Sequence, residues 1–155
     1  MNKSMNYEKL LIEAEKLNIT VKEIELNEHG GLCIGNIIFI DKKLKDTSKY
    51  CVLAEELGHY RLTVGNITDQ SKTENRKQEI IARRWGFENL VRILDIIKAY
   101  EAGTKNRYEM AEFIGVTESF LDESIKYYKA KYGTYFKIDN YTVYFEPNLG
   151  IVKMF

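Results

Sequence analysis

Apolar residues recur at two different spacings along this chain, and the switch between them sets the fold class. Spacings of three and four residues are typical of helices with one buried face, whereas alternating and β-branched runs are typical of strands. The helical spacing covers 7–17, a stretch from residues 46–48 to about 62, 74–102 with a break between Gly86 and Arg92, 107–115 and 118–131. The strand patterns cover 19–26, 32–35, 37–40, 135–145 and 151–154. We therefore expect an α+β protein.

Glycines and polar residues divide this pattern into two parts. Residues 66–73 are predicted to form a polar loop, and Gly103 is expected to end the long helical stretch. A first unit over 1–102 and a smaller unit over 104–155 follow from this division. With one proline and no Gly/Ser tract, a long flexible linker is not expected.

Composition excludes several broad classes of protein. Lys and Arg total 23 and Asp and Glu total 23, so net charge gives no general attraction to nucleic acid. No run of about 18 apolar residues is present, and the start of the chain lacks the apolar segment of a signal peptide. Cys33 and Cys51 cannot build a disulfide framework. These features predict a cytoplasmic protein without a membrane span.

The segment LAEELGHY over residues 53–60 carries most of the chemistry. On a helix, Glu55, Glu56 and His59 lie on one face, whereas Tyr60 lies near an apolar stripe. A metallopeptidase helix needs such a layout, with two metal ligands one turn apart and an adjacent glutamate that activates water. The usual motif is His-Glu-x-x-His, and this chain has Glu-Glu-x-x-His. Taken alone, the segment is more often a solvated charged face.

Other segments stand at suitable distances from this helix. The segment YCVLAEELGHY over residues 50–60 is followed about 20 residues later by QEIIARRW over 78–85, and short strand patterns at 31–32 and 37–40 precede both. In these pieces and their order, the chain resembles the ImmA/IrrE family of metallopeptidase-like proteins. Residues 100–112 and the tyrosine-rich hairpin resemble its subgroup from phages and mobile elements. The resemblance implies a zincin-like helical core with a small β-sheet, followed by a helix pair and a β-hairpin.

The resemblance also implies a role for each site residue. His59 matches the second histidine ligand of a divalent metal, Glu79 matches the carboxylate ligand from the next helix, and Glu56 matches the general base. Glu55 stands where the family has its first histidine ligand. Zinc is the expected ion, with manganese as the alternative. The other histidine of the chain, His29, lies in a glycine-flanked turn and is expected to be a surface residue.

A carboxylate at position 55 changes what such a site can do. Carboxylates ligate zinc, but one imidazole and two carboxylates neutralise the ion, which makes it a weaker Lewis acid and favours harder ions such as Mn²⁺. Without a metal, Glu55, Glu56 and Glu79 repel one another, and at least one is expected to hold a proton near neutral pH. Three interpretations stay open: an enzyme with an altered ligand, a metal-binding protein with little hydrolysis, or a degenerate site kept for its fold.

Two functions follow from the resemblance and the altered ligand. The first is a metal-dependent endopeptidase of a phage or mobile element that cleaves a helix-turn-helix repressor to switch gene expression. The second is a catalytically silent relative that binds a repressor or regulator by occupancy. In either case, the neighbouring Arg83 and Arg84 are expected to form ion pairs with nearby acids.

Residues 107–125 themselves look like a helix-turn-helix. However, Glu118, Asp122 and Glu123 stand early in its second helix, where they would be repelled by phosphates. A structural helix pair is therefore expected here, with no direct contact to nucleic acid. The hairpin at 135–145 offers strand edges to which an extended peptide can add.

Overall fold

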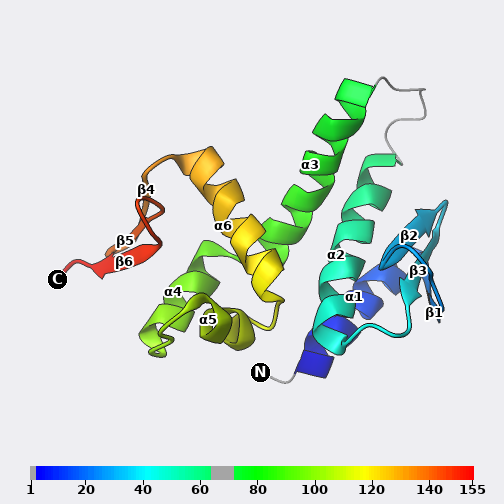
Figure 1. Cartoon of the computed structure of the whole chain (residues 1–155), viewed down its shortest axis with the longest axis horizontal. Helices are drawn as coiled ribbons and strands as arrows, with labels where there is room; N and C mark the ends of the chain where they lie inside the picture. The colour runs from blue at the N-terminus through cyan, green and yellow to red at the C-terminus, as the bar shows by residue number, and fades with distance from the viewer. Residues whose placement is uncertain (1–2, 64–71) are drawn as a thin grey trace. The chain divides into compact units, whose positions relative to one another are not determined.

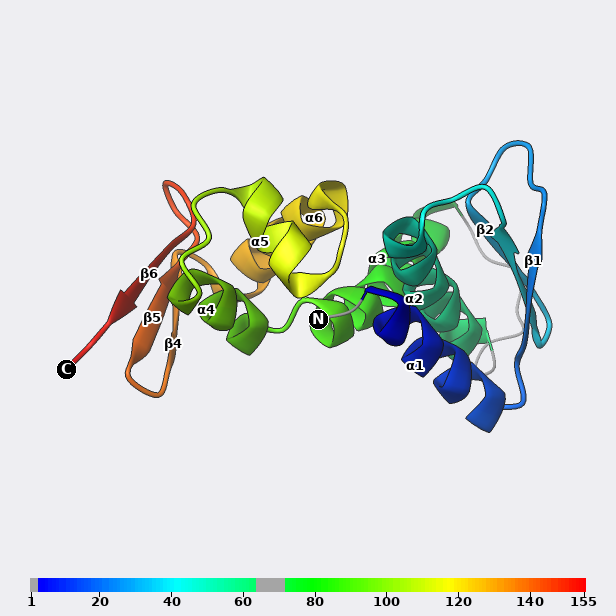
Figure 2. The same cartoon turned by 90° about the horizontal axis from the view of Figure 1, so that it is seen from below.

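The computed structural model describes residues 3–63 and 72–155. The chain forms two compact units, Met1–Leu90 and Val91–Phe155, and in the described ranges each unit combines helices with a sheet of three strands (Figure 1, Figure 2). The predicted α+β class is confirmed. None of the helices in these ranges is long and apolar enough to cross a lipid bilayer.

The first unit packs a mixed sheet against helices. Its elements are α1 (Lys3–Lys16), β1 (Thr20–Ile24), β2 (Gly31–Ile34), β3 (Ile37–Asp41), α2 (Asp46–Thr63) and α3 (Lys72–Leu90). The sheet order is β1-β3-β2, with β1 parallel and β2 antiparallel to the central strand β3. Helix α2 contacts β2 and β3 as well as α1 and α3, which places it at the centre of the unit (Figure 2).

Burial of aliphatic side chains explains this central position. Leu53, Ala54 and Leu57 on α2 are fully buried, as are Ile38 and Ile40 on β3. The side chains of β3 alternate between buried and half-buried, because successive side chains of a strand point to opposite faces of the sheet. Full burial of each large aliphatic side chain contributes about 1.5–3 kcal/mol, so these contacts fix α2 against the sheet.

Helices α2 and α3 approach each other closely at Gly58. A Cβ atom at this position would overlap the carbonyl oxygen of Ala82 and lie 2.9 Å from its carbonyl carbon. Glycine is needed here because the backbone of the facing helix occupies the space of a side chain. The contact sets the separation of the two helices beside His59 and Arg83, the residues that follow Gly58 and Ala82.

The second unit joins a helix pair to an antiparallel sheet. Its elements are α4 (Ile93–Glu101), α5 (Arg107–Ile114), α6 (Glu118–Tyr132), β4 (Tyr135–Ile138), β5 (Tyr141–Tyr144) and β6 (Gly150–Lys153). The sheet order is β4-β5-β6, and α5 packs against both α4 and α6. The unit begins at Val91 and includes α4, whereas the sequence pattern alone places the division near residue 103.

Side-chain caps begin both helices of the pair. The side chain of Asn106 accepts a hydrogen bond from the backbone nitrogen of Glu109 at 2.8 Å, and the Thr117 hydroxyl accepts one from that of Phe120 at 3.1 Å. Between them, Gly115 has a φ of 90°, a left-handed conformation that ends α5. The predicted helix pair is thus confirmed.

Aromatic side chains build much of the core of the second unit. Tyr128 is buried, and its hydroxyl donates a hydrogen bond to the carbonyl oxygen of Val91 at 2.6 Å. Its ring lies 6.0 Å from that of Tyr132 and 6.5 Å from that of Phe145, measured between centroids. Tyr128 therefore combines apolar packing with a satisfied polar group.

Element boundaries differ from the predicted ones by a few residues. Helix α1 already includes Lys3, and the break in the long helical stretch falls at Val91 and Arg92. The Asp95 carboxylate accepts a hydrogen bond from the backbone nitrogen of Arg92 at 3.0 Å, which stabilises the start of α4. Most of the predicted loop over 66–73 lies outside the described residues, and its last two residues already belong to α3.

Candidate active site

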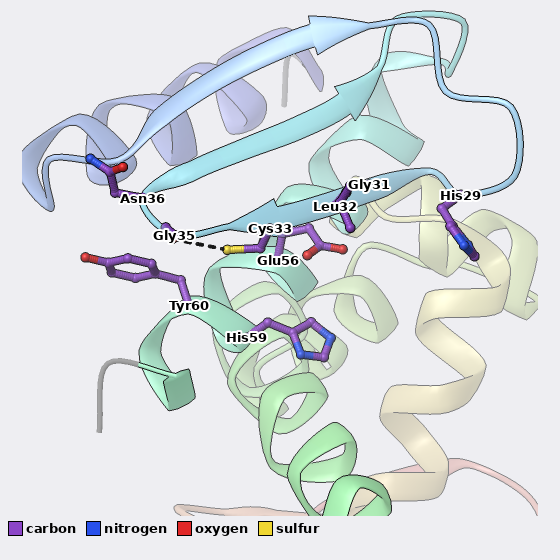
Figure 3. Close-up of a pocket in the computed structure, with 9 residues that line it drawn as sticks. All are labelled: His29, Gly31, Leu32, Cys33, Gly35, Asn36, Glu56, His59 and Tyr60. Carbon is purple, nitrogen blue, oxygen red and sulfur yellow. Dashed lines mark hydrogen bonds between the residues drawn. The ribbon is translucent and has the colours of Figure 1, made fainter. Parts of the chain in front are cut away.

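A pocket of about 700 Å³ lies at β2 and α2 in the first unit (Figure 3). It is lined by the loop before β2 (His29), by β2 (Gly31, Leu32, Cys33), by the turn after it (Gly35, Asn36) and by α2 (Glu56, His59, Tyr60). Two of the four predicted site residues, the proposed base and the proposed histidine ligand, therefore line the same pocket.

Gly31 allows β2 to pass close to Glu56. A Cβ atom on Gly31 would lie 2.5 Å from Cγ1 of Val52 and 3.0 Å from Cγ of Glu56. A larger residue would push the strand away from α2 or displace the Glu56 side chain, since close-packed interiors leave little room. The wall of the pocket at this point is therefore backbone.

The surroundings of Glu56 disfavour its charged form. Burial raises the pKa of the Glu56 carboxyl above its ordinary value; His59 opposes this rise, and the nearby carboxylates of Glu55 and Glu79 add to it. Burial is the largest of these effects, and the repulsion among the three glutamates that the sequence predicts acts in the same direction. Glu56 is thus placed as a group that can exchange a proton within the pocket.

Helix α3 brings further charges to the side of this pocket. Oε2 of Glu79 lies 3.2 Å from Nε2 of His59, and its Oε1 lies 3.3 Å from Nε of Arg83, one turn further along α3. The carboxylate predicted from the second helix therefore meets the predicted histidine. The two oxygens of Glu79 are shared between an imidazole and a guanidinium.

The Glu55 side chain approaches Arg83 of α3. It is absent from the residues lining the pocket, and its Oε1 lies 4.0 Å from Nε of Arg83 on α3. Among residues 3–63 and 72–155, no three His, Cys, Asp or Glu side chains gather so as to hold a metal ion. The structure thus brings His59 and Glu79 together and leaves Glu55 outside this pair. The expected ion pairs of Arg83 and Arg84 are confirmed.

His29 and Tyr60 are among the pocket residues that sequence reasoning did not assign to the site. His29, predicted to be a surface residue, is exposed but borders the pocket, where its charge lowers the pKa of Glu56. Tyr60, placed near the apolar stripe of α2, is half-buried and lines the pocket as well (Figure 3). The position of His29 just before β2 could have indicated that it lies near the site. However, the packing of β2 against α2 depends on residues that are distant in the sequence.

The two cysteines are free thiols, as expected. Cys51 is buried as a small hydrophobic residue of α2. Cys33 lines the pocket, and its Sγ lies 3.7 Å from the carbonyl oxygen of Gly35. Burial raises the pKa of the Cys33 thiol, and the neighbouring Glu56 raises it further, so the thiol form is favoured.

The order and geometry of these elements agree with a known family. The family model of the IrrE N-terminal-like domain, Peptidase_M78, matches residues 11–126. The chain belongs to this family. The match confirms the resemblance to ImmA/IrrE proteins and the zincin-like α+β fold, and it covers α2, α3 and all four predicted site residues. The M78 family is metallopeptidase-like and generally metal-dependent. A search of curated proteins finds no match to the chain.

The donor chemistry of this M78 domain fits a divalent metal at two of its three predicted ligand positions. His59 offers an imidazole nitrogen and Glu79 a carboxylate oxygen, 3.2 Å apart, and zinc binds both donor types. Glu55 offers a suitable oxygen but faces Arg83. The residues therefore suit an ion held by His59 and Glu79, with Glu56 beside it.

Proposed function

We propose that this M78 protein is a metal-dependent endopeptidase of a phage or mobile element, which cleaves a helix-turn-helix repressor and so switches gene expression. The observation that carries the proposal is the pocket shared by Glu56 and His59, with Glu79 at 3.2 Å from His59. A proton-exchanging carboxylate beside an imidazole and a second carboxylate is the set of groups that metal-assisted peptide hydrolysis needs.

His59 and Glu79 would hold the divalent ion. Zinc suits their nitrogen and oxygen donors, and the preference for manganese increases when oxygen donors replace nitrogen donors. Glu55 would be the third ligand if its side chain left Arg83. When bound, the ion supplies Lewis-acid polarisation of a water molecule and of the peptide carbonyl.

Glu56 would act as general base and then as general acid. Its carboxylate takes a proton from the attacking water while the water oxygen bonds to the carbonyl carbon. When the C–N bond breaks, Glu56 returns the proton to the leaving amine. The position of Glu56 under β2, in the same pocket as His59, supports this role.

The strand β2 supports a peptide as the substrate. It is an edge strand, since in the described sheet it pairs with β3 on one side. An extended segment can add to the other edge through backbone hydrogen bonds. Leu32 and Ile34 on β2 are 42% and 59% exposed, which leaves apolar side chains for contact with such a segment. The hairpin considered from the sequence lies in the second unit.

Replacement of Glu56 by glutamine tests the proposal. We expect Glu56→Gln to lower the cleavage of purified helix-turn-helix repressors of the same element by at least about 100-fold, with zinc binding retained. Products are measured by mass spectrometry. Glu88→Gln is the matched control, because Glu88 pairs with Arg84 at 3.3 Å and does not line the pocket. Cleavage by Glu56→Gln at the wild-type rate would contradict the proposal.

The contact between Arg83 and Glu55 favours a second candidate function. With its carboxylate facing a guanidinium, Glu55 is not free to complete a ligand set. The protein would then bind a repressor or regulator by occupancy, without hydrolysis. Under this alternative, Glu56→Gln and His59→Ala leave repressor binding and switching intact. Loss of switching in both folded variants would exclude it.

A further inference from the structure

Two neighbouring arginines of α3 differ in what they face. Nε of Arg83 is buried and lies 3.3 Å from Glu79 on its own helix and 4.0 Å from Glu55 on α2. Nε of Arg84 lies 3.3 Å from Glu88, also one turn along α3. The two pairs within α3 have the same sequence spacing and distance. Nε of Arg84 donates a hydrogen bond to Glu88, whereas Arg83 makes an additional contact with Glu55 on α2.

Arg83 is the cation of a cluster that is rich in carboxylates. Glu55 and Glu79, the two carboxylates predicted to bind a metal, are both partners of Arg83. Repulsion between such carboxylates is offset when a positive charge lies between them. A divalent ion bound by Glu55 and Glu79 would offset the same repulsion that the Arg83 guanidinium offsets.

A purely structural ion pair would not need this geometry. Surface pairs one turn apart on a helix contribute little, and Arg84 with Glu88 supplies such a pair on the same helix. Arg83, by contrast, bridges two helices beside the closest contact between them, at Gly58 and Ala82. Its charge is therefore held next to His59 and Glu79.

We propose that Arg83 is a built-in counter-cation that competes with a divalent metal for Glu55 and Glu79, so that metal binding requires the guanidinium to leave these carboxylates. This inference rests on the proposed metal site and adds regulation to it. Arg83 is a positioning residue in this account, since it acts through the ligands. The affinity of the site for metal is lowered by the presence of Arg83.

Metal binding by the full chain tests the inference without any substrate. The affinity for Zn²⁺ alone, and separately for Mn²⁺ alone, is measured by competition with a chromophoric chelator for wild type, Arg83→Gln, Arg83→Lys and Arg84→Gln. We expect Arg83→Gln to bind metal at least about tenfold more tightly than wild type. Arg84→Gln, the matched control, stays within about twofold. Arg83→Lys lies between, because it keeps the charge but loses the planar fork.

Each outcome separates this inference from the proposed function. If wild type binds no metal but Arg83→Gln does, the inference stands and the metal-dependent function of the wild-type protein fails. If wild type binds metal but cleaves no repressor, the function fails while the affinities still decide the inference. Circular dichroism confirms that each variant is folded. Affinity that is unchanged or weaker in folded Arg83→Gln, or no binding by any folded variant, would overturn the inference.

Discussion

The two units of this protein arrange their charges differently. In the second unit, Arg107 pairs with Asp122 at 2.5 Å, and Lys129 pairs with Glu146 at 2.9 Å, as simple partners. In the first unit, Glu55 and Glu79 share the guanidinium of Arg83, and Glu79 also contacts the imidazole of His59, which lowers the pKa of Glu56. Such unequal sharing costs stability and is tolerated where a site needs it. The shared carboxylates of the first unit belong to the candidate site described above.

The two units also differ in the packing that stabilises them. The first unit depends on close backbone packing at Gly58, where no side chain fits. The second depends on aromatic packing and on the buried hydrogen bond of Tyr128. Substitutions that affect one unit and spare the other therefore test whether these are separate sources of stability.

The largest effect is expected at Gly58. Alanine at this position would overlap the backbone of Ala82, so α2 and α3 must separate. We expect Gly58→Ala to lower the free energy of unfolding of the first unit by about 3 kcal/mol or more. Urea unfolding combined with hydrogen exchange of α2 and of β5 reports each unit separately.

A second glycine provides the matched control for this prediction. A Cβ atom on Gly150 of β6 meets nothing within 4 Å, so Gly150→Ala is expected to change the stability of the second unit by less than about 0.5 kcal/mol. Equal losses in the two variants would show that close packing at Gly58 is not the cause.

Tyr128→Phe is expected to weaken the second unit by about 1–2 kcal/mol. The change removes the donor to the Val91 carbonyl and leaves a buried acceptor without that partner. Tyr135→Phe is the comparison variant, because Tyr135 is half exposed and its change is expected to be nearly neutral. The same urea and exchange measurements apply. A loss confined to the first unit would contradict the separation of the two cores.

Tyr7 is expected to make the stability of the first unit depend on pH in the alkaline range. Burial raises the pKa of Tyr7, and its hydrogen bond to Glu23 at 2.9 Å raises it further. The folded state thus keeps this proton to higher pH than the unfolded state, so its contribution is complete below about pH 10 and is lost above it, by at most about 1.4 kcal/mol per pH unit. Urea unfolding from about pH 8 to pH 11 measures the slope for the first unit. Tyr7→Phe should reduce it, and an unchanged slope would remove Tyr7 as the cause.

The smallest of these effects is expected at the start of α5. Asn106→Ala removes the side-chain acceptor for the Glu109 backbone nitrogen and is expected to cost about 1 kcal/mol in the second unit. Asn106→Asp keeps an acceptor there and should retain most of the stability. Thermal unfolding with exchange of α5 amides measures both. If aspartate were as harmful as alanine, the cap would not be the reason.

Local patterns were sufficient to predict most elements of the fold. The turn at Gly35-Asn36 joins β2 to β3, and the turn at Asp139-Asn140 joins β4 to β5 within the predicted hairpin at 135–145. Both depend on residues adjacent in sequence. The parallel pairing of β1 with β3, which leaves β2 at the edge, depends on contacts between distant residues. No local pattern encodes this order, so the position of His29 at the pocket was not predictable.

The candidate site was also predictable only as far as local sequence patterns reach. Helical geometry placed Glu55, Glu56 and His59 on one face, but it does not specify which neighbouring element meets each side chain. In the structure, β2 covers Glu56, whereas His59 and Glu55 face groups on α3. The prediction that His59 and Glu79 lie together came from the family resemblance. The contact of Glu55 with Arg83 could not be predicted from a helical projection of α2, because Arg83 belongs to α3.

The close approach at Gly58 has a consequence for protein engineering. His59 follows this glycine and Arg83 follows Ala82, so the two small residues hold the register between the helices that carry the polar groups. A slip by one helical turn would shift these groups by about 5.4 Å. A designer who wishes to install a new donor set at positions 55, 79 and 83 can vary those side chains on a fixed frame, provided that the two small residues are left unchanged.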